Sequence, residues 1–106
     1  MKHQFRYYSN DFGVTVIMAS GGYPDQYKNG YQIEGIDKLS NLEKVEVFHS
    51  ATKKVNHKIV TDGGRVLSIT ARSSSLKDAR KKVYKIVEKI KWTNEYHRDD
   101  IAKIKN

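Results

Sequence analysis

Residues 47–71 read VFHSATKKVNHKIVTDGGRVLSITA, and the rest of the chain is interpreted around this stretch. The pattern predicts a strand, a loop, a second strand, a tight turn and a third strand. Ile59–Val60 forms the middle of the second strand. Asp62-Gly63-Gly64 supplies the turn, because glycine accepts the positive φ angles of tight hairpins. Val66–Thr70 returns as the third strand, since β-branched and apolar residues favour that conformation.

Upstream of this stretch, Gly13–Ala19 (GVTVIMA) has apolar residues on both faces, which is typical of a central strand covered on both sides. Two glycines and the chain's single proline follow in Ser20–Pro24 (SGGYP) and indicate an ordered turn. Asn29-Gly30 is a strong hairpin signal, and a short strand is expected at Tyr31–Glu34. Ile36–Lys44 is predicted to be a polar connection with one helical turn.

Downstream, apolar residues recur at helical spacing and predict one long amphipathic helix from Leu76 to about Lys91. Ser75 is its expected N-cap, and Asp78 completes a capping box. A second, short helix is predicted over Asp99–Lys105. The fold class is therefore α+β: a mainly antiparallel sheet of four to five strands with the helix of residues 76–91 packed on it, followed by the short C-terminal helix.

Length and composition limit the class of protein. The 106 residues are expected to form a single domain, 1–106, with a modest core. The absence of cysteine excludes disulfides and cysteine-based zinc sites. No apolar run approaches the roughly 20 residues of a membrane span, and the N-terminus lacks the apolar core of a signal peptide. We expect a soluble cytoplasmic protein with no membrane partner.

The chain is strongly basic, with a formal net charge of +8 and a pI of about 9.7. Residues 77–91 hold seven cations and two anions, a local net charge of +5. Such a face attracts nucleic acid or an acidic protein surface. The simpler interpretation is a solvated helix face opposite the apolar stripe, and the aromatic signature of an RNA-binding sheet is absent.

The sequence contains few motifs that could bind a ligand or catalyse a reaction. SGGYP matches neither the dinucleotide-binding pattern nor the P-loop, so a ligand loop and a structural turn both remain open. Arg65, after Gly63 and Gly64, could hold a phosphate or carboxylate with two hydrogen bonds, or could be a solvated turn residue. The four histidines lack metal-ligand spacing, and no nucleophile–base arrangement is readable. No catalytic residue and no metal ligand are predicted.

Several motifs, in order along residues 14–101, resemble the C-terminal domain of phosphoribosylamine–glycine ligases, also called glycinamide ribonucleotide synthetases, of the ATP-grasp family. Ala51 and Ala102 depart from the pattern, because the family usually has glycine at both positions. The three best-matching segments are VTVIMASGGYP (Val14–Pro24), VFHSATK (Val47–Lys53) and IVTDGGRVLSITA (Ile59–Ala71).

The resemblance implies a role in an ATP-dependent ligase that joins 5-phosphoribosylamine and glycine to give glycinamide ribonucleotide in de novo purine biosynthesis. It implies ATP and Mg²⁺ as cofactors of the full enzyme and none bound by this domain alone. The fold would be that of the C-terminal domain of biotin-carboxylase-like enzymes. The partners would be the enzyme's N-terminal and ATP-grasp domains, which this sequence lacks, and its small-molecule substrates. The isolated chain is expected to be inactive.

Within that enzyme, the domain is expected to pack against the substrate side of the active site and help to close it. The alternative is a detached basic module for nucleic acid or an acidic protein, of which nucleic acid is the less favoured partner. Turn scaffolding is the competing role for each glycine-rich loop. The substrate-side candidates are Ser20, Gly21, Gly22, Tyr23, Thr52, Lys53, Gly63, Gly64 and Arg65.

Overall fold

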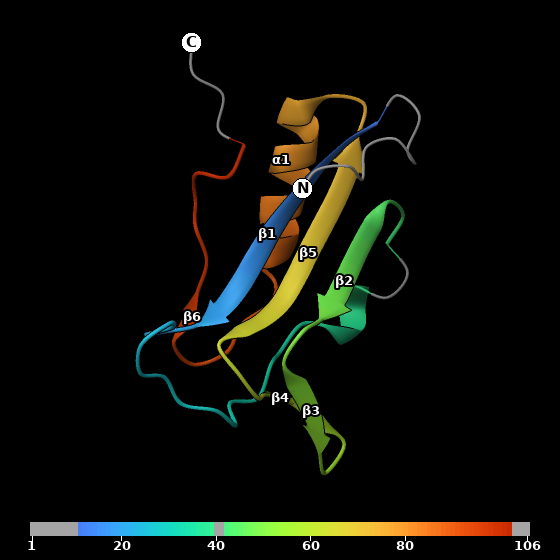
Figure 1. Cartoon of the computed structure of the whole chain (residues 1–106). Coiled ribbons are helices and arrows are strands. Elements are labelled where there is room, and N and C mark those ends of the chain that lie inside the picture. The colour runs from blue at the N-terminus through green and yellow to red at the C-terminus, as the bar shows by residue number, and fades with distance from the viewer. Residues whose placement is uncertain (1–10, 40–41, 103–106) are drawn as a thin grey trace.

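The protein is described by a computed structural model that covers residues 11–39 and 42–102. A four-stranded antiparallel sheet packs against one helix, and a two-stranded hairpin extends from one end of the sheet (Figure 1). The predicted α+β class is confirmed. In chain order the elements are β1 (Phe12–Ser20), the 3-10 helix η2 (Asp37–Leu39), β2 (Val45–His49), β3 (Thr52–Val55), β4 (Lys58–Thr61), β5 (Arg65–Ser73), α1 (Leu76–Val87) and β6 (Glu95–Tyr96).

The sheet has the order β2-β5-β1-β6, so β5 and β1 are the central strands. In their register, Val16 lies opposite Ile69 and both side chains are buried. Ile17, the next residue, is 42% exposed. The prediction that β1 is covered on both faces is therefore wrong. Helix α1 covers one face, and no described element covers the other (Figure 1).

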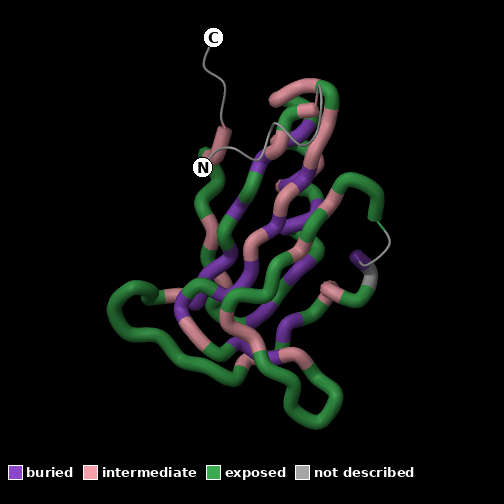
Figure 2. The backbone as a smooth tube through the Cα atoms, turned by 45° about the vertical axis from the view of Figure 1, so that its right-hand side comes forward, coloured by how far each residue is buried: buried purple, intermediate pink, exposed green. Residues whose placement is uncertain are grey.

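The core lies between α1 and the inner face of β1 and β5, where buried positions alternate along the strands (Figure 2). Helix α1 ends at Val87, earlier than predicted, because Ile90 N bonds to Val87 O in a tighter turn and Lys91 turns away to form a bridge with Glu34. Among the described residues, no helix combines the length and apolarity of a membrane span. The buried helix residues are Ala79, Val83, Ile86 and Val87.

The stretch before β5 differs from the sequence interpretation. The predicted loop contains strand β3, which pairs with β4 in a hairpin. Asn56 and His57 close that hairpin with positive φ angles of 50° and 69°. Because β4 pairs with β3 and not with β5, the turn at Asp62–Gly64 connects two different sheets. The predicted hairpin is wrong at this turn, and neither Gly63 nor Gly64 has a positive φ.

The segment before η2 also departs from the prediction. No hairpin forms at Asn29-Gly30, although Gly30 has a φ of +91°. The strand predicted at Tyr31–Glu34 is reduced to isolated bridges, because this segment runs irregularly along β4. The helical turn predicted within 36–44 is confirmed as η2.

The C-terminal segment contains no helix in the part that the structure describes. Residues 99–102 form a bend and a turn. The helix predicted over Asp99–Lys105 is therefore wrong for these four residues, and residues 103–105 lie outside the described residues. Arg80 accounts for the non-helical path, because its guanidinium donates to Asp99 O (2.6 Å) and to Ile101 O (2.9 Å). These bonds hold the segment against α1 in a non-helical path.

Ser75 caps α1 as predicted, since its Oγ accepts a hydrogen bond from Asp78 N at 3.1 Å. Substituting Ser75→Ala should lower the free energy of unfolding by about 1 kcal/mol, because the backbone N–H loses its partner. Urea denaturation followed by circular dichroism would measure the loss. The neighbouring Ser74→Ala variant is the control and should change stability by less than about 0.5 kcal/mol. Equal losses in the two variants would show that capping is not the cause.

Candidate functional site

The two glycine-rich loops meet at one end of the sheet. Ser20, at the end of β1, donates from its backbone N to Gly64 O at 2.7 Å. Its hydroxyl donates to Gly63 O, also at 2.7 Å. Ser20 is only 4% exposed, so both bonds are sheltered from water. We call this contact between residues 20–23 and 63–65 the loop junction.

The glycines of the turn before β5 allow close approach. A Cβ at Gly64 would overlap the ring of Tyr23, which lies directly on this backbone. A Cβ at Gly63 would lie 2.6 Å from the Cβ of Ala51, in the loop between β2 and β3. Both positions thus require glycine for space, and not for a positive φ as the sequence suggested.

Gly21 and Gly22 shape the other side of the loop junction. A Cβ at Gly21 would lie 2.5 Å from Asn94 O, and one at Gly22 would overlap Gln26 O. Gly22 also has a φ of +96°, which L side chains rarely adopt. Both glycines are therefore required by the backbone conformation and close packing of the loop.

The outer surface of the loop junction is aromatic and cationic. The Arg65 guanidinium lies 5.9 Å from the centroid of the Tyr23 ring, and Tyr27 packs edge-on to the same ring at 6.0 Å. All three side chains are partly or largely exposed. Guanidinium groups bind phosphate and carboxylate with two hydrogen bonds, and aromatic faces accept flat or cationic groups. The surface is suited to a small anionic ligand.

The two remaining candidates lie on β3, beside the same turn. Lys53 Nζ is 3.8 Å from Asp62 Oδ1, an exposed ion pair that contributes little stability. Thr52 Oγ1 shares a hydrogen bond of 2.9 Å with His49 Nδ1. Asp62 N donates to Ala51 O at 2.8 Å and so joins the loop before this strand to the turn. All nine substrate-side candidates therefore gather at one end of the molecule.

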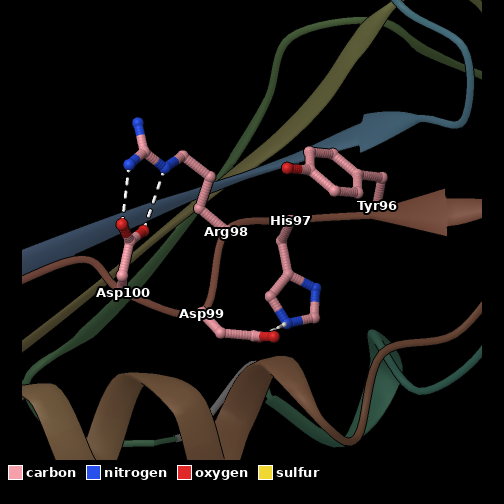
Figure 3. Close-up of a pocket in the computed structure, with 5 residues that line it drawn as sticks. All are labelled: Tyr96, His97, Arg98, Asp99 and Asp100. Atoms are coloured by element: carbon pink, nitrogen blue, oxygen red, sulfur yellow. Dashed lines mark hydrogen bonds and ion pairs between the residues drawn. The ribbon is translucent and has the colours of Figure 1, made fainter.

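A shallow hollow elsewhere is lined by residues 96–100 (Figure 3). Arg98 donates two hydrogen bonds to the Asp100 carboxylate, at 2.9 and 2.7 Å, and this pairing raises the pKa of the guanidinium above its ordinary value. His97 Nε2 lies 3.3 Å from Asp99 Oδ1. These side chains therefore bond to one another. In the described part of the chain, no cluster of His, Asp and Glu could hold a metal ion.

Sequence reasoning missed three residues that complete the loop junction: Tyr27, Ala51 and Asp62. Their contacts link segments that are far apart in sequence, and no periodicity reports such contacts. The sequence could have pointed to Tyr27, because this residue follows SGGYP closely and is a large aromatic residue in a polar loop. The sequence could also have pointed to Ala51, because the family that this chain resembles usually has glycine there. In the structure, the methyl group of Ala51 lies against Gly63.

The Tyr23–Gly64 contact makes a measurable prediction. Gly64→Ala should lower the free energy of unfolding by about 2 kcal/mol, because the new methyl displaces the Tyr23 ring. In Tyr23→Ala the obstacle is gone, so adding Gly64→Ala should cost at least about 1 kcal/mol less than it does alone. A double-mutant cycle by urea denaturation measures this coupling. Phe12→Ala, at the opposite end of β1, is the control partner and should add to Gly64→Ala without coupling.

Comparisons with known proteins give a consistent result. Residues 13–104 match the family model for the phosphoribosylglycinamide synthetase C domain. The phosphoribosylamine–glycine ligase of Rhodopirellula baltica is 42% identical over 89 residues, which cover 84% of this chain and 20% of the relative. The ligase of the same name from Chlorobaculum tepidum is 46% identical over 89 residues, which cover 84% and 21%.

A solved structure shares the fold. The crystal structure of phosphoribosylamine–glycine ligase from Thermotoga maritima superposes with a TM-score of 0.70 at 31% identity, covering 83% of this chain and 21% of that one. The chain thus spans about a fifth of the length of these ligases. Because the family match covers most of the chain, and the fold agrees with it, this chain belongs to the phosphoribosylglycinamide synthetase C-domain family.

Proposed function

We propose that this chain is the C-terminal domain of a phosphoribosylamine–glycine ligase and acts as part of that enzyme in the cytoplasm. The reaction joins 5-phosphoribosylamine and glycine with the use of ATP and Mg²⁺, in de novo purine biosynthesis. The supporting observation is the identity of 42% and 46% to two enzymes of that name over most of this chain. ATP and Mg²⁺ would be bound by the other domains of the enzyme.

Within the enzyme, we place the loop junction on the substrate side of the active site. Arg65 presents exposed positive charge there beside the Tyr23 ring, and the exposed Lys53 lies near the same turn, paired with Asp62. A phosphate or carboxylate of a substrate would pair with such cations. The buried Ser20 bonds would hold the loops in a fixed position as the site closes.

The test uses the full-length ligase that contains this domain. Arg65→Ala should raise the KM for phosphoribosylamine about tenfold, because a hydrogen bond to a charged group is worth about 1.5–3 kcal/mol. Lys58→Ala, an exposed cation on β4, is the control and should leave KM within about twofold, the effect of less than 0.5 kcal/mol. An unchanged KM in Arg65→Ala would remove this residue from the substrate side.

The isolated 106-residue chain should show no turnover. Glycine-dependent hydrolysis of ATP in the presence of phosphoribosylamine, catalysed by this chain alone, would contradict the proposed division of labour between domains. The same assay on the full-length enzyme is the positive control.

The alternative of a detached basic module rests on α1. Lys77, Lys81 and Lys85 are exposed and follow one another at four-residue intervals, opposite the buried helix face. This arrangement also satisfies the simpler description of a solvated amphipathic helix. The match to the ligase domain over residues 13–104 favours the enzyme.

A further inference from the structure

The face of the sheet that points away from α1 carries exposed apolar side chains. Ser68 on β5 lies between Phe48 on β2 and Ile17 on β1 in the strand register. Residues directly opposite one another in a sheet point to the same side. Phe48 is 62% exposed and Ile17 is 42% exposed. Two large apolar side chains therefore stand on this face with only a serine between them.

A third exposed ring extends this row to the sheet edge. Tyr96 on β6 pairs with Ala19, near the end of β1, where the register between β1 and β5 shifts. Figure 3 shows Tyr96 on the side of its own strand, β6, away from α1, whereas the side chain of His97 points toward the helix. Tyr96 is 58% exposed. We call the surface formed by Ile17, Ser68, Phe48 and Tyr96 the open face.

The chemistry of the open face suits a protein partner. The next row of the sheet, toward the start of β1, holds the hydroxyls of Thr15 and Thr70, which share a hydrogen bond of 2.6 Å. The row of Phe48, Ser68 and Ile17 holds no charged residue, and its charged neighbours in the register are Glu46, opposite Thr70, and Arg65, opposite Ala19. Cores of protein interfaces are rich in aromatics and poor in charge. A polyanion would instead favour the lysine face of α1.

The size of the open face indicates which partner it meets. Phe48 and Tyr96 would each bury at most on the order of 150–250 Å². Since both are already partly covered and Ile17 is smaller, the three side chains together fall short of the roughly 800 Å² per partner of a stable complex between free proteins. A covalently tethered domain needs far less surface, because its effective concentration is in the millimolar range. This chain spans about a fifth of the ligases that it resembles, and the full-length ligase of the proposed function would supply such domains.

We propose that the open face is the surface by which this domain docks onto another domain of the same ligase polypeptide. This inference rests on the proposed function. The open face is continuous with the loop junction, because Phe48 lies near the end of β2 and the loop that follows this strand holds Ala51, which lies against Gly63. Docking here would therefore set the position of the loop junction at the substrate side.

The chain has no cysteine, so single thiols can be introduced as probes. Phe48→Cys places a thiol on the open face, and Ile17→Cys is a second, independent probe. Val55→Cys is the matched control, since Val55 is an apolar side chain of similar exposure, 42%, on β3 away from the open face. Each variant is made in the full-length ligase and in the 106-residue chain. N-ethylmaleimide modification is followed by mass spectrometry of the peptide that contains the new thiol.

Docking predicts that the Phe48→Cys and Ile17→Cys thiols react at least tenfold more slowly in the full-length ligase than in the isolated chain. The Val55→Cys thiol should react at the same rate in both. Equal rates at position 48 and position 17 in an active full-length enzyme would overturn the docking surface and leave the proposed function standing. Loss of both differences together with no ligase activity in the unsubstituted full-length protein would instead contradict the proposed function.

A second copy of the chain is the competing occupant. Sedimentation equilibrium of the isolated chain at about 100 μM, a concentration above the micromolar dissociation constants of weak standard-sized interfaces, should give a monomer. A dimer in which the Phe48→Cys thiol is protected would assign the open face to self-association and would also overturn the proposal. Circular dichroism of each variant verifies that the fold is kept.

Discussion

Substituting Gly35→Ala should lower the free energy of unfolding by about 3 kcal/mol, a large effect for a single methyl group. Gly35 has a φ of +95°, which strains an L residue by about 1 kcal/mol. The larger cost is steric. The new methyl would overlap Lys89 O and lie 2.9 Å from its carbonyl carbon, so the backbone itself must move.

The displaced backbone holds two distant segments together. Glu34 N donates to Lys91 O at 2.8 Å, and Lys91 N donates to Glu34 O at 3.0 Å. This reciprocal pair joins the segment before η2 to the segment that follows α1. A shift at Gly35 therefore weakens these bonds as well as the local turn.

Gly30→Ala is the matched control for Gly35→Ala. Gly30 has a nearly identical φ of +91°, but a Cβ there would meet no atom within 4 Å. Its substitution should cost about 1 kcal/mol, the strain of the positive φ alone. Urea denaturation of both variants separates strain from steric overlap. If the two variants lose the same stability, the close approach of Gly35 to Lys89 is not a determinant of the fold.

Ile69→Ala is expected to cost about 3–4 kcal/mol, because it removes buried methyl groups and leaves a cavity. Ile69 lies on β5 with no exposed surface, between Val16 of β1 and Val47 of β2. The cavity would open beneath α1 at the centre of the sheet. Thermal unfolding and urea denaturation should both detect the loss.

Ile17→Ala is the control for this substitution, since it removes the same atoms from the adjacent central strand. Ile17 is 42% exposed on the open face, so its loss should cost less than about 1 kcal/mol in the isolated chain. Comparable losses at Ile69 and Ile17 would mean that the open face is covered in the isolated chain, which would contradict the description of a single helix layer.

Much of the fold could be predicted from hydrophobic periodicity. The helical spacing of Ala79, Val83, Ile86 and Val87 identified α1, and β-branched runs identified β1 and β5. Periodicity does not name a strand's partner, however. The short strand β4 follows the rules for a strand equally well whether it pairs with β3 or with β5, and only the packing of the whole chain selects β3.

The substrate-side candidates came from a resemblance, and their contacts could not be predicted. Ser20 and Gly63 are 43 residues apart, and no local rule links a serine hydroxyl to a carbonyl at that separation. The glycine at position 64 suggested a turn with positive φ, but the reason for it is the Tyr23 ring. From the sequence alone, a glycine that a tertiary contact requires cannot be told from a glycine that a positive φ requires.

The order of strands in the sheet also has a kinetic consequence. The two central strands, β1 and β5, are distant in sequence, and Thr15 and Thr70 on them are 55 residues apart. Pairing distant strands requires closure of a long loop, and the conformational entropy of closure is lost before any contact compensates for it. Such topologies fold slowly. The β3–β4 hairpin and α1 are local and can form early. During synthesis, β1 must therefore wait in an unpaired state until β5 has left the ribosome, and chaperone binding to its Val- and Ile-rich segment would be expected in that interval.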